Sequence, residues 1–427
     1  MIDRIRKILD RQKGIKYLLS ESRVESRELF FVKKALDLKR CKDVTHLSAT
    51  LYRDFVEKGV SYLGSATIDL FPTMTEAEIS KAAESAAFAA GFVKNPVYPL
   101  VKPCTVKSQI HPDYDPDQLL PKLIQGIYEL DIHKDGGINS AELFLNKVCR
   151  RLVNSDGLDV SHDQTAAQLE FIVSWKGPGG EIELYRDLHF SPGRVSFMHS
   201  EIGKMLDCAK DRAKARPTPS GLKCPVLFSG KSAAKLFGYY HYQASAAAIY
   251  QKISRFKIGD RIQGEHVNGD LINLSLPPFL PNSVYSLPYD QDGFPLKEIE
   301  ILRDGNLMRH WGSLRYCHYL GIEPTGVIYN MEVAGGKNDL ATLRQEPHLE
   351  ASIFSDFELD EQTGDFGGEL RLGWYFDGKN RIPVSGGSIT GNLLECQQKM
   401  YLSREIQAEN RFQGPEAVKV FNISISG

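Results

Sequence analysis

The stretch DIHKDGGINSAE, residues 131–142, carries oxygen donors at the spacing that a calcium-binding EF-hand loop requires. The donors are Asp131, Asp135, Asn139 and Glu142, and Gly136 stands where such a loop turns sharply. Carboxylate and amide oxygens in this pattern would bind a hard divalent cation.

Three features oppose a calcium site. His133 occupies a ligand position with a nitrogen donor, which suits calcium poorly. EF-hand loops usually work in pairs, and the sequence has no second loop. The segment that should form the exiting helix runs into the turn signal NSDG, residues 154–157, and the next residues alternate like a strand. We therefore predict a surface turn at DGG, followed by a β-hairpin that bends at NSDG.

Other residues that could do chemistry give weaker signals. His199 and Glu201 could form a metal pair, but isolated His–Glu neighbours are common on exposed helix faces. The glycine pairs lack the strand-to-helix context of a phosphate loop, and no GxSxG motif occurs. Seven widely spaced cysteines without a CxxC motif are typical of reduced thiols and argue against a disulfide framework.

The elements that would position such residues follow from periodicity and turn signals. Helices are expected near the N-terminus, after the capping box Thr75/Glu78, through Leu119, Leu123 and Ile127, and around Ile202. Alternating stretches predict strands, and ARPTPSG is the best linker candidate. The predicted strands cover 27–40, 44–55, 166–175 and 181–190, the linker covers 215–221, and a helix is predicted over 232–253, followed by many short strands.

Composition sets the broad class. A chain of 427 residues is expected to form two or three domains. A net charge of -2 argues against nucleic-acid binding as the main role. The N-terminal residues lack the apolar core of a signal peptide, and no run reaches the ~18 apolar residues of a membrane span, so a cytoplasmic protein without a membrane partner is expected.

Several stretches occur in an order and at spacings that together are specific. They are ELFFVKK, PTMTEAEISKAAESAAFAAGFV, LVNSDGLDVSHDQT, CPVLFSGKSAAKLFGYY, YDQDGFPLKEIEILRDGNLMRHW, LGIEPTG, GGELRLGWYFDGKNRIPVSGGSITGNLLE and PEAVKVFNISISG. In these stretches the chain resembles the TldD/PmbA family, once called modulators of DNA gyrase and regarded as metallopeptidase-type peptide maturation proteins. The resemblance covers nearly the whole chain.

The resemblance implies an α+β fold. An N-terminal α/β domain would span residues 1–216, and a mainly β C-terminal domain would span residues 217–427. The C-terminal domain would carry the helix that bears the metal motif in active members. The elements predicted from the residues agree, because helices and strands alternate early and short strands dominate late.

Active family members resemble zinc peptidases. Their HExxxH helix supplies two histidine ligands and a glutamate that acts on the bound water, and a cysteine near the C-terminus completes the site. The matching stretch here begins with His241, which fits the first histidine. Tyr242 stands in place of the glutamate, and Ala246 in place of the second histidine. The C-terminal segment has no cysteine, and Cys396 lies upstream in a helix-like stretch that does not match.

These departures resemble the PmbA branch of the family, also called TldE, whose members lack the full motif and pair with a TldD-type subunit. The resemblance implies a non-metal subunit that holds an unfolded peptide for a partner's active site. No catalytic residue and no cofactor are then expected in this chain, and zinc is expected only in the TldD-type partner. His241, Tyr242, Gln243 and Ala246 would line the remnant pocket, although His241 would equally suit a core or surface histidine.

Two alternatives stay open, and with them whether the chain is an enzyme. One is an autonomous metallopeptidase with altered ligands, for example His241 together with His266 or Glu265. The other is a non-catalytic homodimer that binds unfolded peptides. Family members resemble tight dimers, so either a heterodimer or a homodimer is expected.

Overall fold

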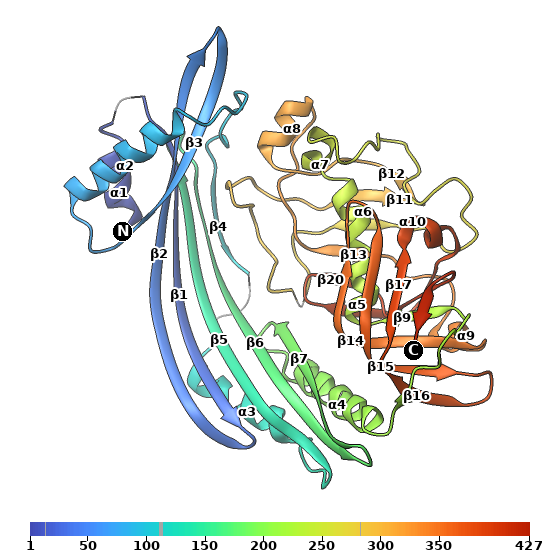
Figure 1. Ribbon diagram of the computed structural model, residues 1–427. Helices are drawn as coiled ribbons and strands as arrows, with labels where there is room; N and C mark the ends of the chain where they lie inside the picture. The colour runs from blue at the N-terminus through green and yellow to red at the C-terminus, as the bar shows by residue number, and fades with distance from the viewer. Residues whose placement is uncertain (13, 111–113, 282) are drawn as a thin grey trace.

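The computed structural model describes residues 1–12, 14–110, 114–281 and 283–427. A long curved sheet with four helices occupies the N-terminal half, and two further sheets with short helices occupy the C-terminal half (Figure 1). The predicted α+β class is confirmed. The elements of the N-terminal half are α1 (Ile2–Leu9), β1 (Lys16–Val32), β2 (Ala35–Glu57), β3 (Val60–Leu70), α2 (Glu76–Ala90), β4 (Thr105–Gln109), α3 (Pro116–Tyr128), β5 (Gly136–Asn154), β6 (Asp159–Gly177), β7 (Gly180–Phe190) and α4 (Val195–Arg212).

The N-terminal sheet has the strand order β3-β2-β1-β5-β6-β4, and β7 also pairs with β6. All pairs are antiparallel except β4 with β6. Buried side chains recur at alternate positions along β5 and β6, as expected for strands with one covered face. Helices α1 and α2 pack on one end of the sheet, and α3 and α4 pack on the other (Figure 1).

Helix α2 begins with the capping box that the sequence predicts. The Thr75 side chain accepts a hydrogen bond from the backbone N–H of Glu78, and the Glu78 carboxylate accepts one from the backbone N–H of Thr75. Replacing Thr75 with alanine should lower the free energy of unfolding by about 1 kcal/mol, because an N–H of the first turn loses its partner. Chemical denaturation measures the loss, and Ser85→Ala on the exposed face of the same helix is the control. Equal losses in the two variants would contradict the capping role.

The calcium-like stretch is a turn and a strand, as predicted. Residues from Gly136 onward enter β5, so the segment that would have been the exiting helix of an EF-hand is extended. At NSDG the Asn154 side chain accepts hydrogen bonds from the backbone N–H groups of Asp156 and Leu158 and closes the β5–β6 hairpin. The Asp131 carboxylate is paired with Lys34.

The C-terminal half contains many short elements. They are β8 (Arg216–Pro217), β9 (Val226–Ser229), α5 (Lys231–Leu236), α6 (Gly238–Gln243), α7 (Ala246–Tyr250), β10 (Leu274–Leu276), β11 (Ile299–Arg303), β12 (Asn306–Leu307), α8 (Leu314–Leu320), β13 (Met331–Val333), α9 (Leu340–Leu343), β14 (His348–Leu359), β15 (Asp365–Phe376), β16 (Arg381–Ser385), β17 (Ser388–Asn392), α10 (Leu393–Cys396), a 3-10 turn (Gln397–Lys399), β18 (Tyr401–Leu402), β19 (Ile406–Glu409), β20 (Phe412–Pro415), β21 (Ala417–Val420) and β22 (Ser424–Ser426).

Two sheets and the α5–α6 segment share one core in this half. One sheet has the order β18-β21-β9-β14-β15-β16-β8, with β17 and β22 attached, and the other has the order β12-β11-β10-β13-β20-β19. Apolar side chains from both sheets and from residues 233–244 form a single buried cluster. The α5–α6 segment is therefore held from both sides, which fixes the direction of the side chains that it presents.

The helix predicted over 232–253 differs in the structure, where it is three short helices. Ser245 is extended, with φ -75 and ψ 137, and its side chain caps α7 by accepting a hydrogen bond from the N–H of Ala248. Trp311 pairs with the break, because its carbonyl accepts a hydrogen bond of 2.7 Å from the N–H of Ala246. A capping serine and a partner distant in sequence override the alanine-rich helical pattern.

The two halves meet through a small cluster around Tyr289. The Tyr289 hydroxyl lies 2.8 Å from Nδ1 of His162 on β6, and both side chains are buried. Elsewhere Trp374 donates a hydrogen bond of 2.8 Å to Asp211 on α4. Arg216 and Pro217, which lie in the predicted linker, pair with β16 of the C-terminal half. The domain boundary between residues 216 and 217 stays a prediction.

Across the residues that the structure describes, no helix is long and apolar enough to cross a membrane.

Candidate functional site

The stretch that matches the metal motif lies on α6 and at the start of α7. His241, Tyr242 and Gln243 end α6, whereas Ala246 begins α7 beyond the break. The predicted site residues therefore do not share one continuous helix. A metal helix needs ligands at a fixed helical spacing, and the break at Ser245 interrupts that spacing between the first and the last position.

His241 is packed against Trp311. The two rings lie 4.2 Å apart between centroids, and the indole N–H of Trp311 donates a hydrogen bond of 2.8 Å to the His241 carbonyl. Nε2 of His241 lies 3.4 Å from the carbonyl oxygen of Ile328. Burial lowers the pKa of His241 to about 4, and the nearby Arg411 acts in the same direction. The imidazole is therefore neutral at pH 7.

The other three predicted residues have structural contacts. Gln243 is buried, and its side-chain N–H group donates hydrogen bonds to the carbonyls of Glu361 and Gln362. Ala246 is fully buried, and a Cβ built on Gly312 would lie only 2.8 Å from the Ala246 methyl. Ala246, which the resemblance places at the position of the second histidine, is thus closely packed. Tyr242 is partly exposed.

The side chains near His241 do not fit a zinc ion. In the described parts of the chain, no group of three or more His, Cys, Asp or Glu side chains is placed to hold a metal ion. Glu265 and His266 are exposed. The Cys396 thiol is buried, and burial raises its pKa to about 12, so the thiolate that zinc prefers does not form at pH 7.

A wide groove lies between the two halves, and sequence reasoning did not find it. Its volume is about 1090 Å³, and α4, β7, α5, β14 and β19 contribute to its walls. None of the four predicted pocket residues lines it. Among the described residues, β7 and β19 each pair with a strand on one side only, and both line the groove, so each has an unpaired sheet edge there.

An ion network spans the groove walls. Nη2 of Arg186 on β7 lies 2.9 Å from Glu201 on α4 and 2.6 Å from Glu409 on β19. All three side chains are at least 85% buried, with side-chain exposures of 15%, 12% and 10% respectively. Because Arg186 and Glu409 are 223 residues apart in the chain, no local sequence pattern pairs them. A second pair, Lys231 with Asp187, joins α5 to β7 nearby.

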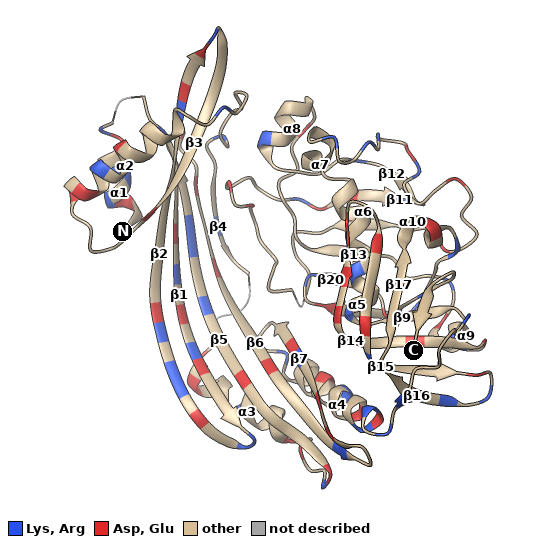
Figure 2. Cartoon of the chain, viewed as in Figure 1, with Lys and Arg blue, Asp and Glu red and all other residues tan. Residues whose placement is uncertain are grey.

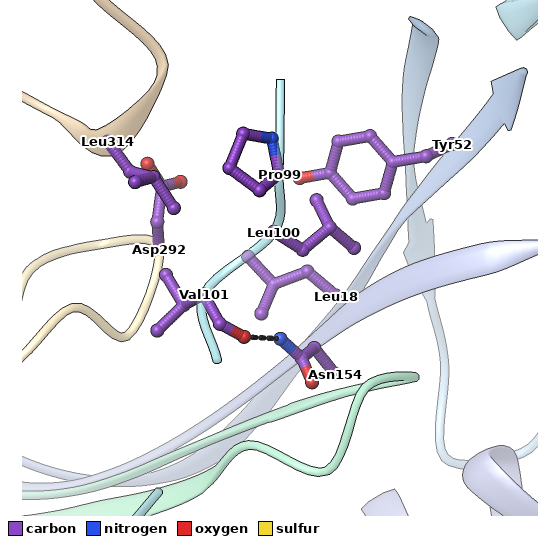
Figure 3. A pocket seen from close by; sticks show the side chains of 8 residues that line it. All are labelled: Leu18, Tyr52, Pro99, Leu100, Val101, Asn154, Asp292 and Leu314. Carbon is purple, nitrogen blue, oxygen red and sulfur yellow. Dashed lines mark hydrogen bonds between the residues drawn. The ribbon is translucent and has the colours of Figure 1, made fainter. Parts of the chain in front are cut away.

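A small cavity of about 20 Å³ lies where the Asp290–Phe294 turn meets the N-terminal sheet. Figure 3 shows the Asp292 side chain beside Leu314, across the cavity from Leu18 and Tyr52. Burial and, to a smaller extent, the neighbouring Asp290 raise the pKa of Asp292 to about 6, against the attraction of Arg315.

The raised pKa of Asp292 predicts a pH-dependent stability. Between the ordinary carboxyl pKa of about 4 and the folded value of about 6, the folded state binds more protons than the unfolded state, so stability falls as pH rises. Asp292→Asn removes this penalty. The variant should exceed the parent by about 2 kcal/mol in free energy of unfolding at pH 7 and by much less at pH 4. Denaturant titrations at both pH values measure this, and an equal gain at both would contradict the assignment.

Comparisons with known proteins agree with this architecture. Residues 221–427 match the model of the PmbA/TldA metallopeptidase C-terminal domain. The chain is 25% identical over 271 residues to metalloprotease PmbA of Escherichia coli O157:H7, which covers 61% of this chain and 58% of that protein. It therefore spans little more than half the length of that relative.

Solved structures show the same fold over the whole chain. TldE from Thermococcus kodakarensis superposes with a TM-score of 0.78 at 18% identity and 100% coverage of both chains. A protein of Thermotoga maritima described as a modulator of a DNA gyrase gives a TM-score of 0.80 at 15% identity, again over 100% of both chains.

Fold and site together define a metallopeptidase-like α+β protein in which the stretch predicted to correspond to the metal motif is divided between two short helices and closely packed. Residues 221–427 match a C-terminal domain of the TldD/PmbA family, and the chain as a whole is similar in fold to TldE.

Proposed function

We propose that this chain is a PmbA/TldE-like, non-metal subunit that works with a TldD-type subunit in the proteolysis or maturation of unfolded peptides. The packing of the motif carries this proposal. Ala246 fills the second histidine position against Gly312, and Tyr242 replaces the acid. The protein itself would hold no zinc and carry no catalytic residue, and the zinc would belong to the partner. The widely spaced cysteines without a CxxC motif favour a cytoplasmic setting.

The groove supports peptide binding by this subunit. Two sheet edges, β7 and β19, face it, and an extended peptide adds to such an edge through backbone hydrogen bonds that do not depend on side-chain identity. Tyr185 and Ile406 provide exposed apolar contacts along the two edges. His241 and Gln243, by contrast, have contacts of a structural kind.

The deciding experiment measures zinc content together with peptide cleavage, with and without a TldD-type chain that bears HExxxH. We expect less than about 0.1 zinc per purified chain, no chelator-sensitive cleavage by the chain alone, and cleavage when the two chains are mixed. Cleavage by the chain alone with stoichiometric zinc would establish an autonomous metallopeptidase. A stable homodimer that binds peptide and ignores the TldD-type chain would establish the non-catalytic binding protein.

A separate variant tests whether the groove binds peptide. Ile406→Glu places a charge in the groove beside the β19 edge, and Ile258→Glu makes the same change at an exposed isoleucine outside it. Only the first should weaken binding of an unfolded, fluorescently labelled peptide, by about tenfold or more. Equal effects would place the peptide elsewhere, while the zinc and partner measurements would still test the subunit role.

A further inference from the structure

Strand β2 has a long unpaired edge at the end of the N-terminal sheet that lies beyond β3. On one side it pairs with β1 from Ala35 to Tyr52, whereas on its other side β3 pairs only with residues 47–57. Residues 35–46, here called the β2 free edge, therefore have no strand on their outer side among the described residues. Figure 1 shows β1 and β2 continuing far beyond the end of β3.

The register shows which backbone groups are unpaired. The β2–β3 hairpin closes on the pair Glu57 and Val60, and residues that flank a two-residue turn exchange both hydrogen bonds. The β2–β3 register runs back without a shift to Leu47, and the β1–β2 register is regular from Leu38 onward, so from Leu38 the odd-numbered residues of β2 point their backbone groups toward the β3 side and the even-numbered ones toward β1. On the free edge, the outward N–H and C=O groups are those of Lys39, Cys41, Asp43 and Thr45.

The side chains at this edge are exposed and partly apolar. Leu36 and Leu38 are 51% and 49% exposed, and Val32 at the end of β1 is 58% exposed. Cys41 is an exposed free thiol at the middle of the edge. Unpaired backbone groups flanked by exposed leucines form a template for a further strand.

The edge also carries an excess of positive charge. Residues 33–46 contain five Lys or Arg and two Asp, in a chain whose net charge is -2. Arg40 pairs with Glu28, Asp43 with Arg23, and Lys34 with Asp131. No carboxylate among the described residues pairs with Lys33, Lys39 or Lys42. Figure 2 shows the basic residues gathered at the distal end of β2 and β1.

We propose that the β2 free edge binds an extended, acidic segment of a partner polypeptide as an added strand. The unpaired N–H and C=O groups provide the hydrogen bonds, and the unpaired lysines select acidic side chains. A second copy of this edge is a poorer occupant, because two copies would bring their excess lysines together. The inference does not depend on the subunit role proposed above.

The reactivity of the Cys41 thiol reports directly on peptide binding at the β2 free edge. The rate of its reaction with a thiol reagent is followed by mass spectrometry of the peptide that contains it, with and without a ten-residue peptide of alternating glutamate and threonine. A second peptide with lysine in place of glutamate is the comparison. We expect the acidic peptide to slow the labelling of Cys41 about fivefold or more and the basic peptide to leave it unchanged, with the protection weakening as salt rises.

Charge reversal tests the lysines. Lys39→Glu combined with Lys42→Glu should weaken binding of the acidic peptide about tenfold or more, whereas Lys81→Glu combined with Lys379→Glu makes the same charge change elsewhere and should not. All four lysines are exposed, and unchanged thermal unfolding checks that the variants fold.

Three results would overturn the proposal. The two peptides could protect Cys41 equally, or the double reversal could leave the affinity unchanged. Protection could also rise with protein concentration in the absence of peptide, which would make a second copy the occupant.

Discussion

Replacing Ala246 with histidine is expected to lower the free energy of unfolding by about 3 kcal/mol, and the histidine should not create a zinc site. Ala246 is fully buried, and its methyl group lies against the backbone of Gly312. An imidazole there must displace packed atoms and would also leave its nitrogens without partners. Chemical denaturation gives the stability, and elemental analysis gives the zinc content.

The neighbouring Ala247 offers a matched control. It is partly exposed, so Ala247→His adds the same side chain in the same short helix and should cost less than about 1 kcal/mol. The more demanding variant combines Ala246→His with Tyr242→Glu and restores the family residue types at all three positions. Stoichiometric zinc with chelator-sensitive cleavage in that variant would show that this segment can still form a metal site and would contradict the packing argument.

Replacing Arg186 with methionine is expected to cost about 3–5 kcal/mol, because Glu201 and Glu409 would remain buried without their shared cation. Arg23→Met removes a partner from an exposed ion pair with Asp43 and should cost less than about 1 kcal/mol. Denaturant unfolding of both variants beside the parent measures the difference. Comparable losses would mean that the Arg186 network is no more important than a surface pair.

The same variant should depend on pH. Burial favours a higher pKa for Glu201, but Arg186 and Lys204 outweigh it and lower the pKa below its ordinary value. This carboxylate therefore stabilises the parent above the unfolded pKa, and the stabilisation is lost as pH falls through the folded pKa. The difference in free energy of unfolding between the parent and Arg186→Met should accordingly shrink as pH falls below about 4. A deficit that stays constant down to pH 3 would point to lost packing instead of lost charge.

Local patterns predicted part of the N-terminal half, but the stretch 27–40, predicted as one strand, contains the end of β1, a two-residue turn and the start of β2. The capping box of Thr75, the hairpin at NSDG and the strand pairs of β6 and β7 follow from residues close together in sequence. The break before α7 was missed, because it depends on Trp311, which lies far along the chain. Ser245 is a local signal for a helix start, but within an alanine-rich segment it is weak, and the distant partner confirms the break.

The functional surfaces were predicted less completely. Family resemblance located the motif at His241, but the roles of its four residues stay a prediction, and the fit of Ala246 against Gly312 required three dimensions. The groove was missed because its walls come from segments as distant as Arg186 and Glu409. The basic composition of residues 33–46 was visible in the sequence, but the unpaired edge became visible only with the length of β3.

The order of strands in the N-terminal sheet has a consequence for the protein's synthesis. Strand β1 pairs on one side with its immediate neighbour β2, and on the other with β5, where Leu18 lies opposite Asn154. The β1–β2 hairpin can form as soon as it leaves the ribosome, but the inner side of β1 must wait until residue 154 has been made. During that interval a nascent chain exposes an unpaired strand edge, which is a template for aggregation until β5 has been made.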